Sequence, residues 1–107
     1  MVNISIYRGD TPTITAVVKD EDGNTVDITG ATMTLSVKEN ENFTSYLFQS
    51  VGSLSNPAVG EVKFFLTTAN TEQTPGTYVY DIQYEKAGEI KTVAKDKFKI
   101  LTDITRP

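Results

Sequence analysis

The segment Thr74-Pro-Gly-Thr-Tyr-Val-Tyr-Asp-Ile-Gln-Tyr84 carries the strongest fold signal in this sequence. It opens with a turn pair, Pro75-Gly76, and then alternates between large apolar and mostly polar side chains. A period of two places successive residues on opposite faces of a β-strand. One face would carry Tyr78, Tyr80, Ile82 and Tyr84, and the other Thr77, Val79, Asp81 and Gln83. The segment therefore predicts a turn that leads into a strand with one buried face.

A tyrosine near the start of such a strand is typical of the tyrosine corner of immunoglobulin-type sandwiches. In that corner the phenol hydroxyl bonds to backbone just upstream and ties the strand to the preceding crossover. Tyr78, with Gly76 in the turn before it, is the candidate for this structural role. We therefore expect an all-β fold, an immunoglobulin-like antiparallel β-sandwich of seven or eight strands.

The rest of the chain alternates over short stretches that turn residues separate. Besides the tyrosine-rich strand, the expected strands cover residues 2–7, 13–19, 31–38, 43–51, 61–67 and 90–101, with a short extended piece at 26–28. Residues 52–60, rich in Ser, Asn, Pro and Gly, are expected to form a loop, and residues 68–73 one helical turn. The spacing predicts one sandwich domain over residues 1–101, followed by a tail or linker start at 102–107.

The inward parity of these strands defines a predicted core. Its members are Ile14, Ala16, Val18, Met33, Leu35, Val37, Val62, Phe64, Leu66, Tyr78, Tyr80, Ile82, Phe98 and Ile100. Asp96 falls on the same parity as Phe98 and Ile100. Because burying an unpaired carboxylate is costly, we expect a β-bulge at Asp96 that shifts the register.

The composition excludes several function classes. The 107 residues contain no cysteine and no histidine, so disulfides, thiolate metal sites and a Ser-His-Asp triad are ruled out. The net charge of −4 argues against a nucleic-acid partner, and no apolar run approaches the ~20 residues of a membrane-spanning helix. The first residues do not form a secretory signal. We therefore expect no enzyme, no cofactor and no metal, in a protein that is made in the cytoplasm.

Two short motifs have both a functional and a structural interpretation. Arg8-Gly9-Asp10 matches the integrin-binding tripeptide, but it also suits a turn between two strands, which we favour. Asp20, Asp22 and Asn24 have the spacing of a calcium loop. The pattern then fails, because a calcium loop needs Gly at its sixth position and Glu at its twelfth, so a hairpin turn with Asp22-Gly23 is favoured.

Two features are candidates for an interface. Phe65 lies between inward Phe64 and Leu66 and should point outward, to an interface or under a crossing loop. Four lysines lie at odd-numbered positions of the last strand and predict a basic stripe along one of its faces: Lys91, Lys95, Lys97 and Lys99. This stripe would contact an acidic partner, remain solvated or prevent the strand edge from pairing with another edge. The carboxylates Asp81, Glu85 and Glu89 have no spacing that forces two of them into one cleft.

Four segments in order resemble one protein family. They are Ile4-Ser-Ile-Tyr-Arg-Gly-Asp-Thr11, Val26-Asp-Ile-Thr-Gly-Ala-Thr32, Gly60-Glu-Val-Lys-Phe64 and Pro75-Gly-Thr-Tyr-Val-Tyr-Asp81. Together they resemble the immunoglobulin-like N-terminal domain of the baseplate upper protein family, found in tails of phages and prophages of Gram-positive bacteria. The order and spacing of the segments carry the resemblance, from Ile4 to about Leu101. Family members commonly continue further, so the chain is expected to be an excised domain or a short stand-alone version.

The resemblance implies a structural, non-catalytic module of a virion tail or baseplate. It implies protein–protein contacts with other tail or baseplate subunits, with a homo-oligomer as one alternative, and it offers no catalytic residues to transfer. A second hypothesis is a carbohydrate-binding or adhesin-type sandwich that contacts the host cell surface, with Tyr7, Tyr46 or Tyr84 stacking on sugars if exposed. An enzyme that uses carboxylates is the least favoured hypothesis.

Overall fold

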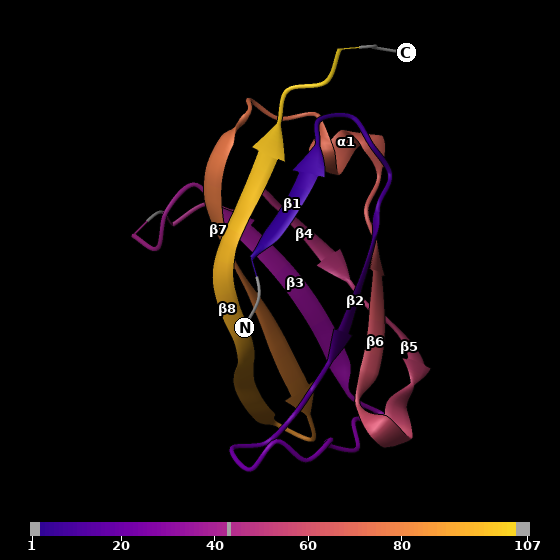
Figure 1. The fold of residues 1–107 in the computed structure, drawn as a ribbon. Coiled ribbons are helices and arrows are strands. Elements are labelled where there is room, and N and C mark those ends of the chain that lie inside the picture. The colour runs from indigo at the N-terminus through magenta and orange to yellow at the C-terminus, as the bar shows by residue number, and fades with distance from the viewer. Residues whose placement is uncertain (1–2, 43, 105–107) are drawn as a thin grey trace.

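The computed structural model describes residues 3–42 and 44–104 as two β-sheets packed face to face (Figure 1). The larger sheet has the strand order β1-β8-β7-β3-β4, and the smaller has the order β2-β6-β5. Their bounds are β1 (Ile4–Tyr7), β2 (Thr13–Val17), β3 (Thr32–Lys38), β4 (Phe48–Val51), β5 (Ser53–Asn56), β6 (Glu61–Phe65), β7 (Gly76–Lys86) and β8 (Glu89–Leu101). A short 3-10 helix, η1 (Pro57–Val59), precedes β6, and α1 (Thr68–Thr71) precedes β7.

The predicted fold class is confirmed. In immunoglobulin nomenclature the smaller sheet has the order B-E-D, and β8-β7-β3-β4 has the order G-F-C-C′ of a variable-type domain. The sandwich is not wholly antiparallel, because β1 pairs in parallel with β8, with Ile4 opposite Phe98. A parallel partner is possible for β1 because no hairpin joins it to β8, which lies at the other end of the sequence.

The sandwich core matches the predicted inward faces. All predicted core residues are buried except Ile14, which is partly buried and packs against the core. The prediction missed Ile6, Ile28, Ala31, Phe48 and Ala94, which are also buried. Ile28 is the most informative omission: it is fully buried, yet it lies in the irregular connection from β2 to β3, where no strand parity exists to reveal it.

The segment before β6 differs from the expectation. Residues 52–60 are not a loop: they contain β5 and η1, and β5 pairs with β6. The preceding strand is also shorter than predicted, because β4 begins at Phe48, and residue 43 lies outside the described residues. The polar sequence of β5, SLSN, has little intrinsic preference for a strand. Its pairing with β6 therefore decides its conformation.

Gly52 allows the chain to pass from one sheet to the other. It separates β4, in the larger sheet, from β5, in the smaller sheet, and its amide donates to the carbonyl of Met33 at 2.7 Å. A Cβ atom on Gly52 would lie 2.5 Å from Cγ2 of Val62 and 2.9 Å from Cε1 of Phe64. The chain therefore crosses against the core at a place where only glycine fits.

The last strand contains a β-bulge, but not where it was expected. Ile82 of β7 pairs with Ala94, whereas Gln83 pairs with Thr92, so Val93 is the extra residue. Asp96 keeps its inward parity, opposite Tyr80, and is only partly buried. Its carboxylate accepts a hydrogen bond from the amide of Lys97 at 2.9 Å, which gives the charge a partner without a register shift.

The predicted helical turn before β7 is confirmed as α1. Thr67 and Asn70 form a capping box, in which each side chain accepts from the other residue's backbone amide. Thr71 is fully buried, and its hydroxyl donates to the carbonyl of Asp10 at 2.7 Å. No helix in the described part of the chain is long and apolar enough to cross a membrane.

Candidate functional site

The outer face of the larger sheet carries a row of polar side chains that crosses four strands. Gln49 of β4 lies opposite Ser36 of β3, Ser36 opposite Asp81 of β7, and Asp81 opposite Lys95 of β8. Ser36 is buried, and its hydroxyl accepts a hydrogen bond from Nε2 of Gln49 at 3.0 Å. We call this set the cross-strand row. It forms because the register between adjacent strands places their outward-facing residues side by side.

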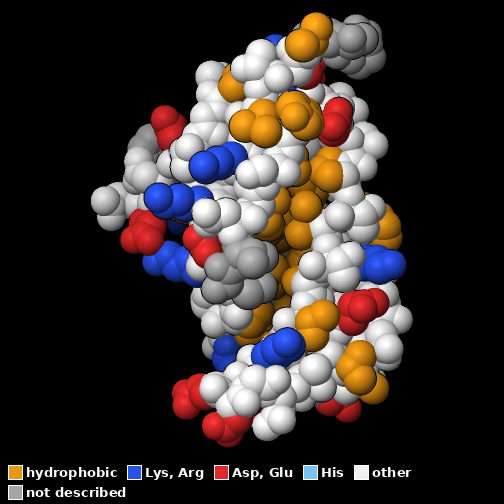
Figure 2. Space-filling model, viewed as in Figure 1, with side chains coloured by type: hydrophobic (Ala, Val, Ile, Leu, Met, Phe, Trp, Pro, Cys, Tyr) orange, Lys and Arg blue, Asp and Glu red, His pale blue; other side chains and the backbone are white. Residues whose placement is uncertain are grey.

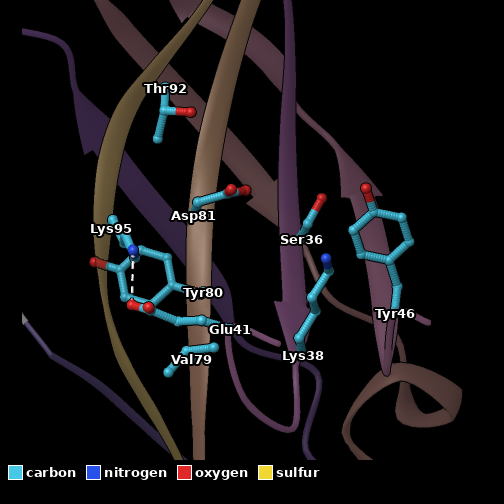
Figure 3. A pocket seen from close by; sticks show the side chains of 9 residues that line it. All are labelled: Ser36, Lys38, Glu41, Tyr46, Val79, Tyr80, Asp81, Thr92 and Lys95. Carbon is cyan, nitrogen blue, oxygen red and sulfur yellow. Dashed lines mark ion pairs between the residues drawn. The ribbon is translucent and has the colours of Figure 1, made fainter. Parts of the chain in front are cut away.

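Asp81 is the central charge of the row (Figure 3). It is partly buried, and this burial raises its pKa, while the ammonium groups of Lys38 and Lys95 act in the opposite direction. Lys95 also forms an ion pair with Glu41, with 2.6 Å between Nζ and Oε1. Two carboxylates and two lysines therefore share one small area of the sheet surface.

Tyr46 adds an aromatic ring to this area. It is 51% exposed, and Nζ of Lys38 lies 4.9 Å from the centre of its ring, within the range of a cation–π contact. These side chains line a depression of about 230 Å³ whose lining also includes Ser36, Val79, Tyr80 and Thr92. The surface offers both signs of charge, hydroxyl groups and a ring face, which are the groups that recognise a protein or a sugar.

The charged groups around Asp81 come from few residue types. Lys38 and Lys95 are the basic groups next to Asp81, and histidine and cysteine are absent from the sequence. In residues 3–42 and 44–104 there is no group of three acidic side chains placed to hold a metal ion. The row therefore places the Ser36 hydroxyl and the Lys95 ammonium on the strands that flank the Asp81 carboxylate, on the outer face of the sheet.

The predicted basic stripe is wrong in one member. Lys95, Lys97 and Lys99 are exposed on the outer face of β8. Lys91 instead pairs with Tyr84, which belongs to the set of β7 residues on the face toward the other sheet. Because Val93 is an extra residue, each residue before it in β8 lies on the face opposite to the one that simple alternation predicts. Lys91 instead lies 6.0 Å from the ring centre of Tyr84 and 3.5 Å from Glu89, beside a second depression of about 560 Å³.

Phe65 points outward as its parity predicted. It is 58% exposed on the outer face of the smaller sheet, opposite Thr13 of β2, whereas its neighbour Phe64 is fully buried. It is therefore remote from the cross-strand row, on the other face of the sandwich (Figure 1). The two candidate interface features are separate surfaces.

The tyrosine at the start of β7 makes the bond expected of a tyrosine corner. The hydroxyl of Tyr78 donates to the backbone carbonyl of Thr74, and burial raises the pKa of Tyr78. Gly76 already belongs to β7 and does not have a positive φ. A Cβ atom there would lie 4.0 Å from the Tyr78 ring, an ordinary contact, so the corner does not require a glycine.

The two short motifs are both turns. Gly9 has a φ of 85°, the amide of Asp10 bonds to the carbonyl of Tyr7, and Arg8 forms a 3.0 Å ion pair with Asp103. This pairing holds the arginine of the tripeptide against the protein. In the acidic hairpin, Oδ1 of Asp20 accepts from the amides of Asp22 and Asn24, and Gly23 has a φ of 84°. The carboxylate of Asp20 therefore stabilises its own turn.

The remaining predicted candidates are spread over the molecule. Asp81 pairs with Lys95, Glu85 pairs with Ile90, and Glu89 lies beside the β7–β8 turn. Tyr7 is 55% exposed on β1, and Tyr84 is half-buried. The sequence alone did not indicate that Ser36 belongs to the cross-strand row, or that Lys38 and Glu41 lie beside it. Outward parity was a usable signal for Ser36 and Lys38, but Glu41 lies in an aperiodic loop.

A scan against models of known protein families finds no match for this chain, and no curated protein matches its sequence.

Proposed function

We propose that this chain is a structural, non-catalytic module of a phage or prophage tail or baseplate protein, which acts through protein–protein contacts. The observation that carries the contact role is the cross-strand row with Glu41 and Tyr46 beside it: opposite charges and a ring on an open sheet face. Charge pairs of this kind orient a partner and set specificity. The tail or baseplate assignment is supported by the four ordered segments and by the immunoglobulin-like fold.

Labelling of assembled particles tests this proposal. The chain, carrying an affinity tag, would be expressed in a bacterium that produces the phage or prophage particles to which we assign it. The purified particles would be imaged by immunogold electron microscopy. We expect label at the tail end in the wild type. We expect a large loss of label in Lys95→Glu, because this change puts a third negative charge beside Asp81 and Glu41.

The matched control is Lys63→Glu, on the outer face of the smaller sheet. It makes the same charge change away from the row, so we expect labelling to persist. Circular dichroism of the purified variants would establish that both are folded. Label that is absent from the tails of wild-type particles would contradict the proposal.

A second candidate function is binding of carbohydrate on the host cell surface. It is favoured by the exposed ring of Tyr46 beside the hydroxyl and charged groups of the depression. We expect a glycan array to yield a ligand whose binding is lost in Tyr46→Ala and kept in Tyr7→Ala, which removes a similarly exposed tyrosine elsewhere. An array without any binder would eliminate this candidate.

A further inference from the structure

The depression beside the cross-strand row has a lining whose charges balance. Its charged members are two lysines and two carboxylates: Lys38, Lys95, Glu41 and Asp81. Figure 2 shows that acidic and basic side chains are mixed on the side of the molecule where β7 and β8 lie, whereas hydrophobic side chains gather in the seam between the sheets. The lining therefore has no net charge with which to attract an ion.

Two of these four charges pair with each other, and the other two do not. Nζ of Lys95 lies 2.6 Å from Oε1 of Glu41, and this is the ion pair drawn in Figure 3. Among the residues that the structure describes, neither the Asp81 carboxylate nor the Lys38 ammonium has an ion pair or a side-chain hydrogen bond. One acceptor and one donor are thus left for a ligand.

Asp81 and Lys38 are close enough to act on the same ligand. Asp81 lies opposite Ser36, and Lys38 is two residues beyond Ser36 on the same face of β3. Diagonal neighbours in a sheet lie about 7–8 Å apart, which is within the reach of a long side chain. The Lys38 ammonium also acts on the Asp81 carboxylate through its charge.

A charged ligand gains little in this depression. A cation that approaches Asp81 is repelled by Lys38 and Lys95, and an anion that approaches Lys38 is repelled by Asp81 and Glu41. This repulsion offsets the attraction that the opposite charge supplies. A hydroxyl group avoids both effects, because it donates and accepts hydrogen bonds without a charge. Two neighbouring hydroxyls of one molecule can therefore donate to Asp81 and accept from Lys38.

The size and the aromatic lining of the depression suit one unit of a longer chain. Its volume of about 230 Å³ is below the roughly 300–1,000 Å³ of pockets that enclose a whole small ligand. Tyr46, which is 51% exposed, adds a ring with an apolar face. An apolar ring beside hydrogen-bonding groups fits a sugar, which has C–H groups on its faces and hydroxyls around its edge.

We propose that this depression binds one uncharged sugar residue of an oligosaccharide, whose hydroxyls bridge the Asp81 carboxylate and the Lys38 ammonium and whose ring lies against Tyr46. The inference rests on the carbohydrate-binding candidate function described above. It adds that the ligand carries no charge, because the balanced lining disfavours ions of both signs. Lys38 is also a positioning residue, because its ammonium contacts the Tyr46 ring at 4.9 Å.

A glycan array tests the charge selection when it carries each oligosaccharide in three matched forms. These forms are the unmodified neutral sugar, the same sugar with a free amino group in place of one hydroxyl, and the same sugar with a sulfate ester. The tagged protein would be clustered on an antibody, so that weak binding becomes multivalent and measurable. We expect the wild type to bind a neutral form at least about tenfold more strongly than its two charged counterparts.

Two substitutions should change the charge preference in opposite directions. Lys38→Met leaves an excess of negative charge, so the amino form should gain at least about tenfold relative to the neutral form. Asp81→Asn leaves an excess of positive charge, so the sulfated form should gain instead. Lys99→Met is the control, because Lys99 is exposed on β8 outside the depression, and it should keep the wild-type preference. Circular dichroism would establish that the variants are folded.

The outcomes separate this inference from the candidate function on which it rests. A wild type that prefers a charged form would overturn the inference and leave carbohydrate binding in place. Variants that weaken all three forms equally would also overturn it, because Asp81 and Lys38 would then not select by charge. An array without any binder would overturn both the inference and the carbohydrate candidate, and would leave this surface to a protein partner.

Discussion

The hydroxyl of Tyr78 donates a hydrogen bond to the backbone carbonyl of Thr74, four residues earlier in the chain. This bond fixes the path of the chain from α1 into β7, while the ring of Tyr78 is only 8% exposed in the core. One side chain thus connects the crossover with the central strand of the larger sheet.

Replacement of Tyr78 by phenylalanine should lower the free energy of unfolding by about 1–2 kcal/mol. It keeps the packed ring and removes the hydroxyl, so the Thr74 carbonyl loses its partner. Urea denaturation would measure the loss. Tyr46→Phe, at a tyrosine that is 51% exposed, is the control and should remain within about 0.5 kcal/mol of the wild type. Equal effects of the two changes would argue against a structural role for the corner.

Gly52→Ala should destabilise the protein by about 1–3 kcal/mol, because its Cβ atom would be forced against Val62 and Phe64. Gly76→Ala is the matched change, since its Cβ atom would make only an ordinary contact and its φ is not positive. It should be neutral or stabilising by up to about 1 kcal/mol, because alanine restricts the unfolded chain. Thermal unfolding of the two variants would separate them, and a neutral Gly52→Ala would show that the crossover between the sheets is not this tight.

Ala87→Asn should stabilise the β7–β8 hairpin by about 0.5–1 kcal/mol. Ala87 and Gly88 form its two-residue turn with φ values of 52° and 84°, and such turns favour Asn-Gly. An alanine in the left-handed region is strained, whereas asparagine tolerates it. Gly88→Ala should have the opposite effect, a loss of about 1 kcal/mol. A melting temperature that falls in Ala87→Asn would contradict the turn geometry.

Asp81→Asn should raise stability at about pH 7, and the gain should vanish at about pH 3. Burial raises the pKa of Asp81 above its ordinary value of 3.8, so the folded state binds this proton more tightly than the unfolded chain. The free energy of unfolding therefore falls as the pH rises from 3.8 through the higher pKa of the folded state. Asparagine removes this titration. The measurement is urea denaturation of both proteins across that range.

Asp27→Asn is the control of opposite sign. The Thr29 hydroxyl and amide lower the pKa of Asp27, so its ionised form is favoured on folding. Asp27→Asn should therefore be less stable than the wild type at about pH 7, with a difference that shrinks as the pH falls through the pKa values. If the free energies of unfolding of Asp81→Asn and the wild type changed with pH in the same way, the pKa of the Asp81 carboxylate would not be raised as described.

The sequence predicted the strand faces well wherever alternation was unbroken. Strands β3, β6 and β7 bury the predicted residues, because a period of two assigns every side chain once one of them is placed. The same rule explains the error at Lys91. One extra residue, Val93, reverses the parity of the strand, and neither it nor its neighbours mark the bulge in the sequence.

The binding surface was less predictable for a related reason. The outward positions of Asp81 and Lys95 follow from alternation, but their alignment in one row depends on the register between strands. Glu41 and Tyr46 reach that row from the connection between β3 and β4, which has no periodicity. Contacts made by such a loop depend on its three-dimensional path, which local patterns do not specify.

The neighbours Phe64 and Phe65 provide the most direct test of a two-layer sandwich with one sealed core and free outer faces. Phe64 is fully buried between the sheets, and Phe65 is 58% exposed on the opposite side of the same strand. Chemical denaturation should show a loss of about 3–5 kcal/mol for Phe64→Ala and a change within about 0.5 kcal/mol for Phe65→Ala. Similar losses for both variants, or a larger loss for Phe65→Ala, would contradict the account.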